Sequence, residues 1–145
     1  VWGAENASAK ISGQNPDLLI IAFGMNYGSF GVSLEDFEAS VRSIISTAKS
    51  LYPECDIVLI STTLPNEEVY QSDGKTLFMG THREQPAVLS RIAQDTGAAF
   101  VNVTAIHEKL LENKRFVDMT GNNTNHPNDF LARMYVQALM KTVTE

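Results

Sequence analysis

His126 stands in a segment whose composition suits a catalytic base. It follows a polar loop rich in asparagine and glycine, residues 120–125, and it precedes residues 128–139, in which apolar side chains recur at helical spacing. Asparagine and proline on either side of it are typical of turns and helix starts. We therefore expect His126 at or just before a helix, with its side chain reaching out of the fold. An imidazole changes charge near neutral pH, so it can accept and release a proton there.

Asn26 is the second residue whose position suggests chemistry. It follows the apolar run of residues 18–23 and lies beside Gly24, which would let a ligand approach the backbone closely. A side-chain amide can donate a hydrogen bond to a developing oxyanion, and such a donor contributes on the order of 3 kcal/mol in acyl-transfer enzymes. Because asparagine also favours turns, a purely structural role in an Asx turn is the alternative.

Three short apolar runs alternate with segments of helical periodicity. The runs are too short for typical helices and indicate strands buried on both faces of a parallel sheet, joined by right-handed crossovers. They are residues 18–23, 56–61 and 98–103, and the main helical segments are residues 33–52, 82–96 and 128–139. This order predicts a single three-layer α/β/α domain over residues 1–145. Sheets usually have about five or six strands. We therefore expect further strands, either before Val1 or from another chain.

The topology also predicts where a site should form. In an open parallel sheet, ligands bind beyond the carboxyl ends of the strands, so the loops that hold Asn26 and His126 should meet there. A long polar segment after the second strand, residues 62–80, should join them. His82 follows this segment and is a candidate to border the pocket, since loops often set specificity. His107 has lysine and glutamate neighbours, and we expect it to face solvent.

Composition excludes several classes of protein. The net charge is -6 and the 11 Lys and Arg residues are scattered, which argues against nucleic acid as a partner. The single cysteine, Cys55, excludes an intramolecular disulfide and a cysteine-based zinc site. No apolar run approaches the roughly 20 residues of a membrane span. No Gly-x-Gly-x-x-Gly element follows a strand, which argues against a dinucleotide-binding module.

Two motifs together resemble a known superfamily. Residues 24–26, Gly-Met-Asn after an apolar strand, and residues 126–128, His-Pro-Asn at the start of a helix, resemble the third and fifth sequence blocks of the SGNH (GDSL-type) esterases and acetylhydrolases. The resemblance covers nearly the whole chain. It implies a flavodoxin-like α/β/α domain that hydrolyses acyl esters through a serine nucleophile. It implies no metal or organic cofactor, and we expect a carbohydrate acetyl ester or a similar small-acyl ester as the substrate.

The resemblance also implies roles for individual residues. His126 corresponds to the general base and Asn26 to an oxyanion-hole donor, while Gly3 is the nearest counterpart of the glycine that completes the oxyanion hole. Beside them, we expect three residues to contact substrate, namely Met25, Tyr27 and His82.

The chain departs from the family pattern at two catalytic positions. No Gly-Asp-Ser nucleophile element is present, and Ser29 does not have the flanking glycines of a nucleophile elbow. We expect the serine to lie before Val1, so that the isolated chain shows no appreciable turnover. Asn123 replaces the aspartate that usually precedes the histidine by three residues, and a neutral amide stabilises an imidazolium less. Asp118 or a backbone carbonyl could take its place. The alternative function is a non-catalytic domain that binds carbohydrate or an anion.

Overall fold

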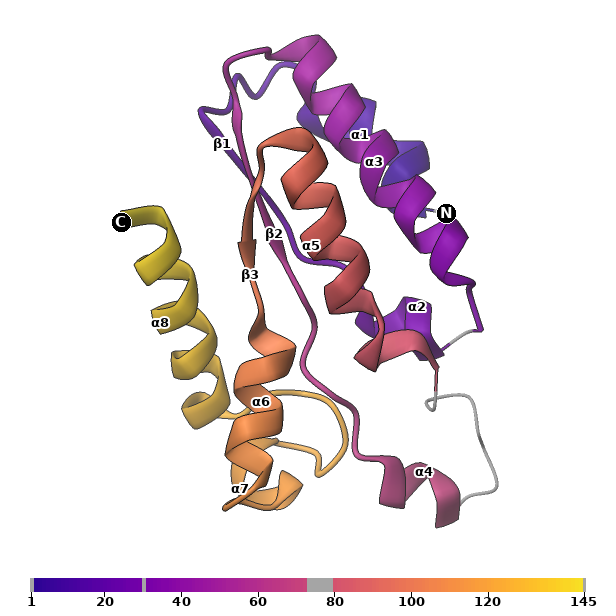
Figure 1. Cartoon of the computed structure of the whole chain (residues 1–145), viewed down its shortest axis with the longest axis vertical. Coiled ribbons are helices and arrows are strands. Elements are labelled where there is room, and N and C mark those ends of the chain that lie inside the picture. Colours follow the sequence, from indigo (N-terminus) through magenta and orange to yellow (C-terminus); the bar gives the residue numbers. More distant parts are fainter. Residues whose placement is uncertain (1, 30, 73–79, 145) are drawn as a thin grey trace.

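A computed structural model describes residues 2–29, 31–72 and 80–144, and it shows a parallel sheet between two layers of helices (Figure 1). The three strands lie in the order β1 (Leu18–Ile21), β2 (Asp56–Ile60) and β3 (Ala99–Val101), and both pairings are parallel. The predicted three-layer α/β/α architecture is confirmed. All three strands run toward the lower part of Figure 1, so their carboxyl ends share one edge of the sheet.

The helices divide between the two faces and the carboxyl edge. One face of the sheet is covered by α1 (Trp2–Ile11), α3 (Leu34–Leu51) and α5 (Gln85–Thr96), and the other by α8 (Asp129–Thr144). Near the carboxyl edge lie α2 (Met25–Ser29), α4 (Glu67–Ser72), the 3-10 helix η2 (Thr81–Arg83), α6 (Val103–Leu111) and α7 (Phe116–Met119). The helix expected over residues 82–96 is thus two elements, with Pro86 in the first turn of α5.

Strand β2 is the centre of the core because both of its faces are buried. Ile57 and Leu59 pack in one cluster with α1, α3 and α5, whereas Val58 and Ile60 pack in a second cluster with side chains of α8. Alternate side chains of a strand point to opposite faces, so this one strand joins both helix layers. Its uninterrupted apolar sequence is what a strand covered on both sides requires.

Strand β1 differs from the prediction that both faces of every strand are buried. Leu18 is 41% exposed and Ile20 is 43% exposed, whereas Ile21 is buried. Ile20 is in register with Val58, so it lies on the α8 side of the sheet, where α8 packs mainly against β3. In the part of the chain that the structure describes, the outer edge of β1 pairs with no other strand. An apolar face and a strand edge are therefore both uncovered.

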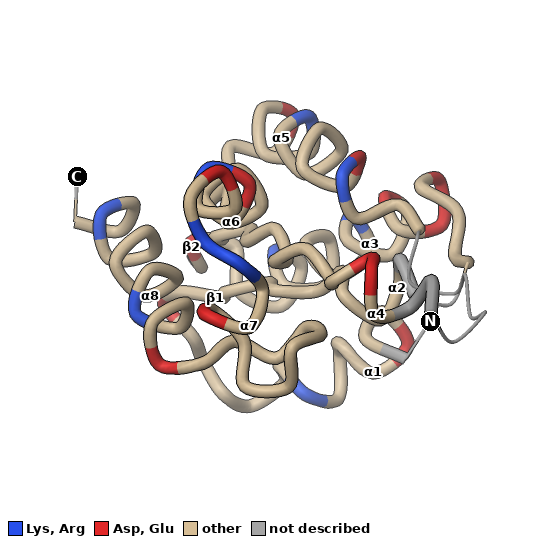
Figure 2. The backbone as a smooth tube through the Cα atoms, turned by 90° about the horizontal axis from the view of Figure 1, so that it is seen from below, with Lys and Arg blue, Asp and Glu red and all other residues tan. Residues whose placement is uncertain are grey.

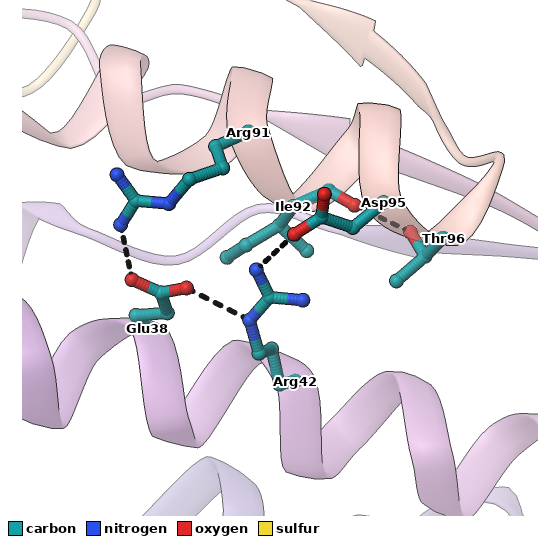
Figure 3. A network of polar contacts seen from close by, with 6 residues as sticks. All are labelled: Glu38, Arg42, Arg91, Ile92, Asp95 and Thr96. Carbon is teal, nitrogen blue, oxygen red and sulfur yellow. Dashed lines mark hydrogen bonds and ion pairs between the residues drawn. The ribbon is translucent and has the colours of Figure 1, made fainter.

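Helices α3 and α5 are joined by a chain of ion pairs (Figure 3). Glu38 pairs with Arg91 and with Arg42, whose Nε lies 2.8 Å from the carboxylate, and Arg42 also contacts Asp95 at 2.5 Å. The hydrogen bonds from Arg91 and Arg42 hold the pKa of Glu38 below its ordinary value. These contacts fix the lateral position of α5, whose first turn borders the carboxyl edge of the sheet.

The central position of β2 predicts that two leucine-to-alanine substitutions differ greatly in how much they lower the free energy of unfolding. Leu59 is completely buried and Leu51, at the end of α3, is 39% exposed. Leu59→Ala should lower the free energy of unfolding by about 2–5 kcal/mol, because it leaves a cavity between the sheet and its helices. Leu51→Ala is the matched control and should cost less than about 1 kcal/mol. Urea unfolding measures both, and equal losses would contradict this account of the core.

Candidate active site

Asn26 and His126 line one cleft of about 340 Å³ at the carboxyl edge of the sheet. Its walls come from three segments that are far apart in the sequence, namely residues 22–26 after β1, residues 60–63 at the end of β2 and residues 125–127 before α8, with Tyr135 from α8. Met25 lines the same cleft. The convergence that the parallel topology predicted is therefore present, and it brings together residues about one hundred positions apart.

Backbone hydrogen bonds hold His126 in its loop. Asn122 Oδ1 accepts from the backbone N–H groups of Thr124, Asn125 and His126 at 3.0, 3.0 and 3.1 Å. The His126 carbonyl accepts from Gly121 N at 2.9 Å. This arrangement leaves the exposed imidazole on a backbone that is tied down on both sides.

The helix that follows is capped two residues later. Asn128 Oδ1 accepts from the N–H groups of Phe130 and Leu131 at 3.0 and 3.2 Å, which satisfies two donors of the first turn of α8. His126 thus lies just before the helix start, as its sequence context predicted.

Asn123 lies beside a second cleft and not in the one that contains His126. Its backbone is left-handed, with φ 53, and its carbonyl accepts from Asn66 Nδ2 at 2.9 Å while its Oδ1 lies 3.4 Å from the same nitrogen. The second cleft has a volume of about 690 Å³ and is also lined by Lys114 and Phe116. The carboxylate of Asp118, the alternative partner, is bound by Arg115 at 3.0 Å. An orienting role for Asn123 stays a prediction.

Asn66 and Asn122 are two residues that the sequence reasoning missed. Asn66 is 4% exposed and binds both Asn123 and the carbonyl of Thr124, so it connects the loop after β2 to the loop of His126. Asn122 organises the His126 loop as an Asx turn. The density of asparagine in residues 122–128 was the available signal, since this side chain commonly bonds to backbone groups two or three residues on.

The backbone beside Asn26 is held from the other side by α5 and the 3-10 helix η2. Gln85 Nε2 donates to the Gly24 carbonyl at 3.0 Å, and His82 Nε2 lies 2.8 Å from the Met25 carbonyl. His82 is 2% exposed and is not part of the cleft lining. Burial lowers its pKa, which favours a neutral ring that donates to the carbonyl. His82 therefore contacts the protein backbone, and its predicted contact with substrate is untested.

Gly3 and Tyr27 are not among the residues that line the cleft. The ring of Tyr27 packs edge-on against Phe37, with centroids 5.5 Å apart, at the margin of the core. Gly3 is part of α1 and faces the ring of Phe23. Of the seven residues proposed from the sequence, the cleft brings together Met25, Asn26 and His126.

Ser61 lines the cleft, but its hydroxyl is occupied by hydrogen bonds within the fold. It is fully buried, its Oγ lies 3.3 Å from Asn102 Oδ1, and it accepts from the N–H of Thr104 at 3.0 Å. These bonds anchor the start of α6 to the end of β2. Among the described residues no group of three or more His, Cys, Asp or Glu side chains could hold a metal ion, and no helix is both long and apolar enough to cross a membrane.

His107 is buried, so the expectation that it faces solvent is wrong. It is 0% exposed, its Nδ1 accepts from Leu64 N at 3.0 Å, and its ring packs edge-on against Phe116. Burial lowers its pKa to about 4. The ring thereby supports the loop after β2 from below. Its spacing of four residues from Val103, a buried residue of the same helix, was the signal that places it on the inner face.

Positively and negatively charged residues are interspersed along the backbone and do not gather in one region of the described chain (Figure 2). Lys114 and Arg115, in the turn between α6 and α7, are adjacent in sequence but have separate partners. Lys114 Nζ lies 4.8 Å from the centre of the Phe130 ring, and Arg115 pairs with Asp118. In the regions that the structure describes, this pair does not extend into a basic surface of the kind that binds a phosphate backbone.

Comparison with known proteins gives one family and one fold. The sequence profile of the GDSL-like lipase/acylhydrolase family matches residues 2–133. A catalytic mutant of an acetylxylan esterase from Geobacillus stearothermophilus superimposes with TM-score 0.78 and 19% identity, over 99% of this chain and 66% of that chain. An α/β hydrolase enzyme from the metagenome of Lake Arreo, Spain, superimposes with TM-score 0.76 and 13% identity, over 97% of this chain and 65% of that chain. This chain thus spans less than two thirds of either length. No protein of curated function matches the sequence.

The buried His107 predicts a loss of stability in mild acid. The unfolded chain binds a proton at about pH 6.5, whereas the folded ring does so only near pH 4, so the stabilisation is present above pH 6.5 and is lost as the pH falls toward 4. His107→Gln keeps an acceptor for Leu64 N but does not titrate. Urea unfolding between pH 7 and pH 4 should show a drop that is larger in the wild type than in the variant, by on the order of 2–3 kcal/mol. If the free energy of unfolding fell equally with pH in the wild type and in His107→Gln, the lowered pKa of His107 would be contradicted.

The Asn122 hydrogen bonds predict a local effect on the loop of His126. Asn122→Ala should speed amide hydrogen exchange at residues 124–126 by about tenfold, because each lost bond contributes about 1 kcal/mol. Exchange in β2 should not change. The exposed Asn113, in the turn after α6, provides the control Asn113→Ala. Unchanged exchange at His126 in Asn122→Ala would show that other contacts hold the loop.

Proposed function

This chain belongs to the GDSL-like lipase/acylhydrolase family, and from that membership and from its cleft we propose that it forms part of an ester hydrolase. The observation that carries the proposal is the presence of Asn26 and His126 in one cleft. Both are on backbone segments that other side chains hold in place. An imidazole that can move a proton and an amide that can donate to an oxyanion are two of the three groups that acyl transfer needs.

The proposed reaction has two steps. In the first, His126 takes the proton of a serine hydroxyl as its oxygen attacks the acyl carbon, and the Asn26 amide donates to the carbonyl oxygen as this becomes an oxyanion. The ester C–O bond then breaks, and the proton passes from His126 to the leaving alcohol. In the second step water attacks the acyl-serine by the same route and releases the carboxylic acid. All of these groups are side chains, so we propose no metal or organic cofactor.

We propose that the serine comes from a segment outside these 145 residues that pairs with β1. The uncovered edge of β1 and the exposed side chains of Leu18 and Ile20 support this. A strand added in parallel to β1 would end beside Gly24 and Asn26, and the residue after it would reach the cleft of His126. The hydroxyl of Ser61, which lines the cleft, accepts a hydrogen bond from Thr104 N at the start of α6. On this proposal the chain as given does not hydrolyse esters.

For the substrate we propose an acetyl or other small-acyl ester of a carbohydrate. The fold shared with an acetylxylan esterase supports this choice. So does the open cleft, in which Thr62 and Asn125 line the walls together with the two proposed catalytic residues and can bond to sugar hydroxyls. Because Asn123 Oδ1 faces Asn66, we propose that Asn123 affects the position of the His126 loop and not the charge of the imidazole.

The alternative is a carbohydrate-binding domain without catalysis, and the amide at Asn123 in place of a carboxylate favours it. The two functions predict different outcomes for acetylated xylooligosaccharides. A binding domain would retain them with their acetyl groups intact, even in a polypeptide that includes a serine beside β1, and His126→Ala would weaken binding.

Hydrolysis by a polypeptide that joins this chain to its nucleophile segment tests the proposal. His126→Ala should lower kcat for an acetyl ester by about 10²–10⁴-fold, since it removes the base. Asn26→Ala should lower it by about 10²–10³-fold, since it removes an oxyanion donor. Asn113→Ala is the surface control and should keep full activity. Wild-type rates in both site variants would refute the assignment of this cleft.

A further inference from the structure

We propose that His82 and Gln85 are positioning residues, which hold the backbone of Gly24 and Met25 and thereby keep Asn26 at the rim of the cleft. This inference rests on the proposed function in so far as Asn26 serves the reaction. The contacts of His82 and Gln85 with this backbone, which we call the hold, belong to the fold and can be tested separately from the function.

The hold consists of two hydrogen bonds to neighbouring carbonyls. Gln85 Nε2 lies 3.0 Å from the oxygen of Gly24, and His82 Nε2 lies 2.8 Å from the oxygen of Met25. A carbonyl can only accept, so each of these nitrogens must donate. Both side chains are almost fully buried, at 0% and 2% exposure. Two consecutive peptide groups are therefore fixed directly before Asn26.

The backbone at Gly24 is shaped to receive Gln85. Its φ is +148, a region that residues with a Cβ rarely adopt, and an added Cβ would lie only 2.2 Å from Gln85 Oε1. The side-chain amide thus occupies the space that any other residue at position 24 would need. Glycine at this position is explained by close contact with Gln85 as well as by the turn.

The amide of Gln85 is not explained by packing alone. Its Oε1 is buried and, among the described residues, has no hydrogen-bond partner. An unpaired buried oxygen is unfavourable, and methionine would fill a similar volume without one. The nitrogen of the same amide makes the bond to Gly24. We infer that this donor is the reason for glutamine at this position.

The base of the hold is rigid. Leu89 and Ile92 anchor α5 in the core, at 1% and 0% exposure. On the outer side, the ion pairs of Arg91 and Asp95 tie the same helix to α3 (Figure 3). Gln85, in the first turn of α5, is therefore an anchored partner for the Gly24 carbonyl, and His82 bonds to the Met25 carbonyl from the adjacent η2.

Gln85→Met tests the hold in this chain as it stands. The change keeps the volume and removes the donor. Amide chemical shifts and hydrogen exchange of residues 24–27 should change, with exchange faster by about fivefold or more, while the melting temperature stays within a few degrees. Gln94→Met, on the exposed side of the same helix, should leave residues 24–27 unchanged. Wild-type shifts and exchange at these residues in Gln85→Met would overturn the proposal.

A second variant covers the case in which Gln85→Met does not fold. His82→Phe keeps a ring of similar size and removes the bond to the Met25 carbonyl. It should give the same local change at residues 24–27. Unchanged exchange there would also overturn the proposal.

Activity of the polypeptide that includes the nucleophile separates positioning from stability. Gln85→Met should lower kcat by about 10–100-fold with little change in KM, because misplacement of a catalytic group acts on the transition state. In an Asn26→Ala background the same change should lower kcat less than about twofold, since the group it positions is gone. The proposal would be overturned if Gln85→Met lowered kcat by the same factor in the Asn26→Ala background as in the wild type. If Asn26→Ala alone has no effect, the proposed function fails, and the exchange data still decide whether the hold exists.

Discussion

The structure depends on the burial of β2 on both of its faces. Ile57 and Leu59 on one side and Val58 and Ile60 on the other join the two helix layers through a single strand. Because both neighbouring strands are parallel to it, their carboxyl ends lie at one edge, and the segments that leave them must meet there. The cleft is a consequence of this arrangement, as no local sequence motif contains all of its walls.

Polar contacts then fix the positions of the segments that the sheet brings together at its carboxyl edge. Buried side chains that reach from one segment to the backbone of another include Asn66, His82, Gln85 and His107. Asn66, Gln85 and His107 each bond to a backbone group in a loop, and His82 bonds to the carbonyl of Met25, the first residue of α2. The exposed side chains of Asn26, in α2, and His126, in the loop before α8, therefore stand on backbone that hydrogen bonds from other side chains hold in place. Rigid support of this kind is what a catalytic group requires for accurate placement.

Periodicity predicted the three strands, the crossovers and the position of His126 before a helix, because these follow from local pattern and parallel topology. The helical segment expected from residue 33 begins with a cap at Ser33, whose hydroxyl accepts from Asp36 N at 3.0 Å. His107 was misplaced because its polar neighbours in the sequence outweighed its spacing from Val103. The contacts of Gln85 with Gly24 could not be predicted, since they join residues 61 positions apart and depend on how α5 meets the sheet.

The uncovered edge of β1 connects the fold to the proposed chemistry. Leu18 and Ile20 are apolar and exposed, and a strand edge tends to pair with another strand. A strand placed there would bury this face and would end at the cleft that Asn26 and His126 line. On the proposed function, the same strand would bring the nucleophile, so it would complete both the sheet and the site.

The most direct test is the crystal structure of a polypeptide that includes this chain and its nucleophile segment, after reaction with a phosphonate ester that mimics the tetrahedral intermediate. We expect a phosphonylated serine at the end of a strand paired with β1. We also expect a phosphonyl oxygen about 2.7–3.1 Å from Asn26 Nδ2, and the imidazole of His126 within hydrogen-bond distance of the serine Oγ. A phosphonylated serine elsewhere, or an adduct in this cleft that contacts neither Asn26 nor His126, would contradict it.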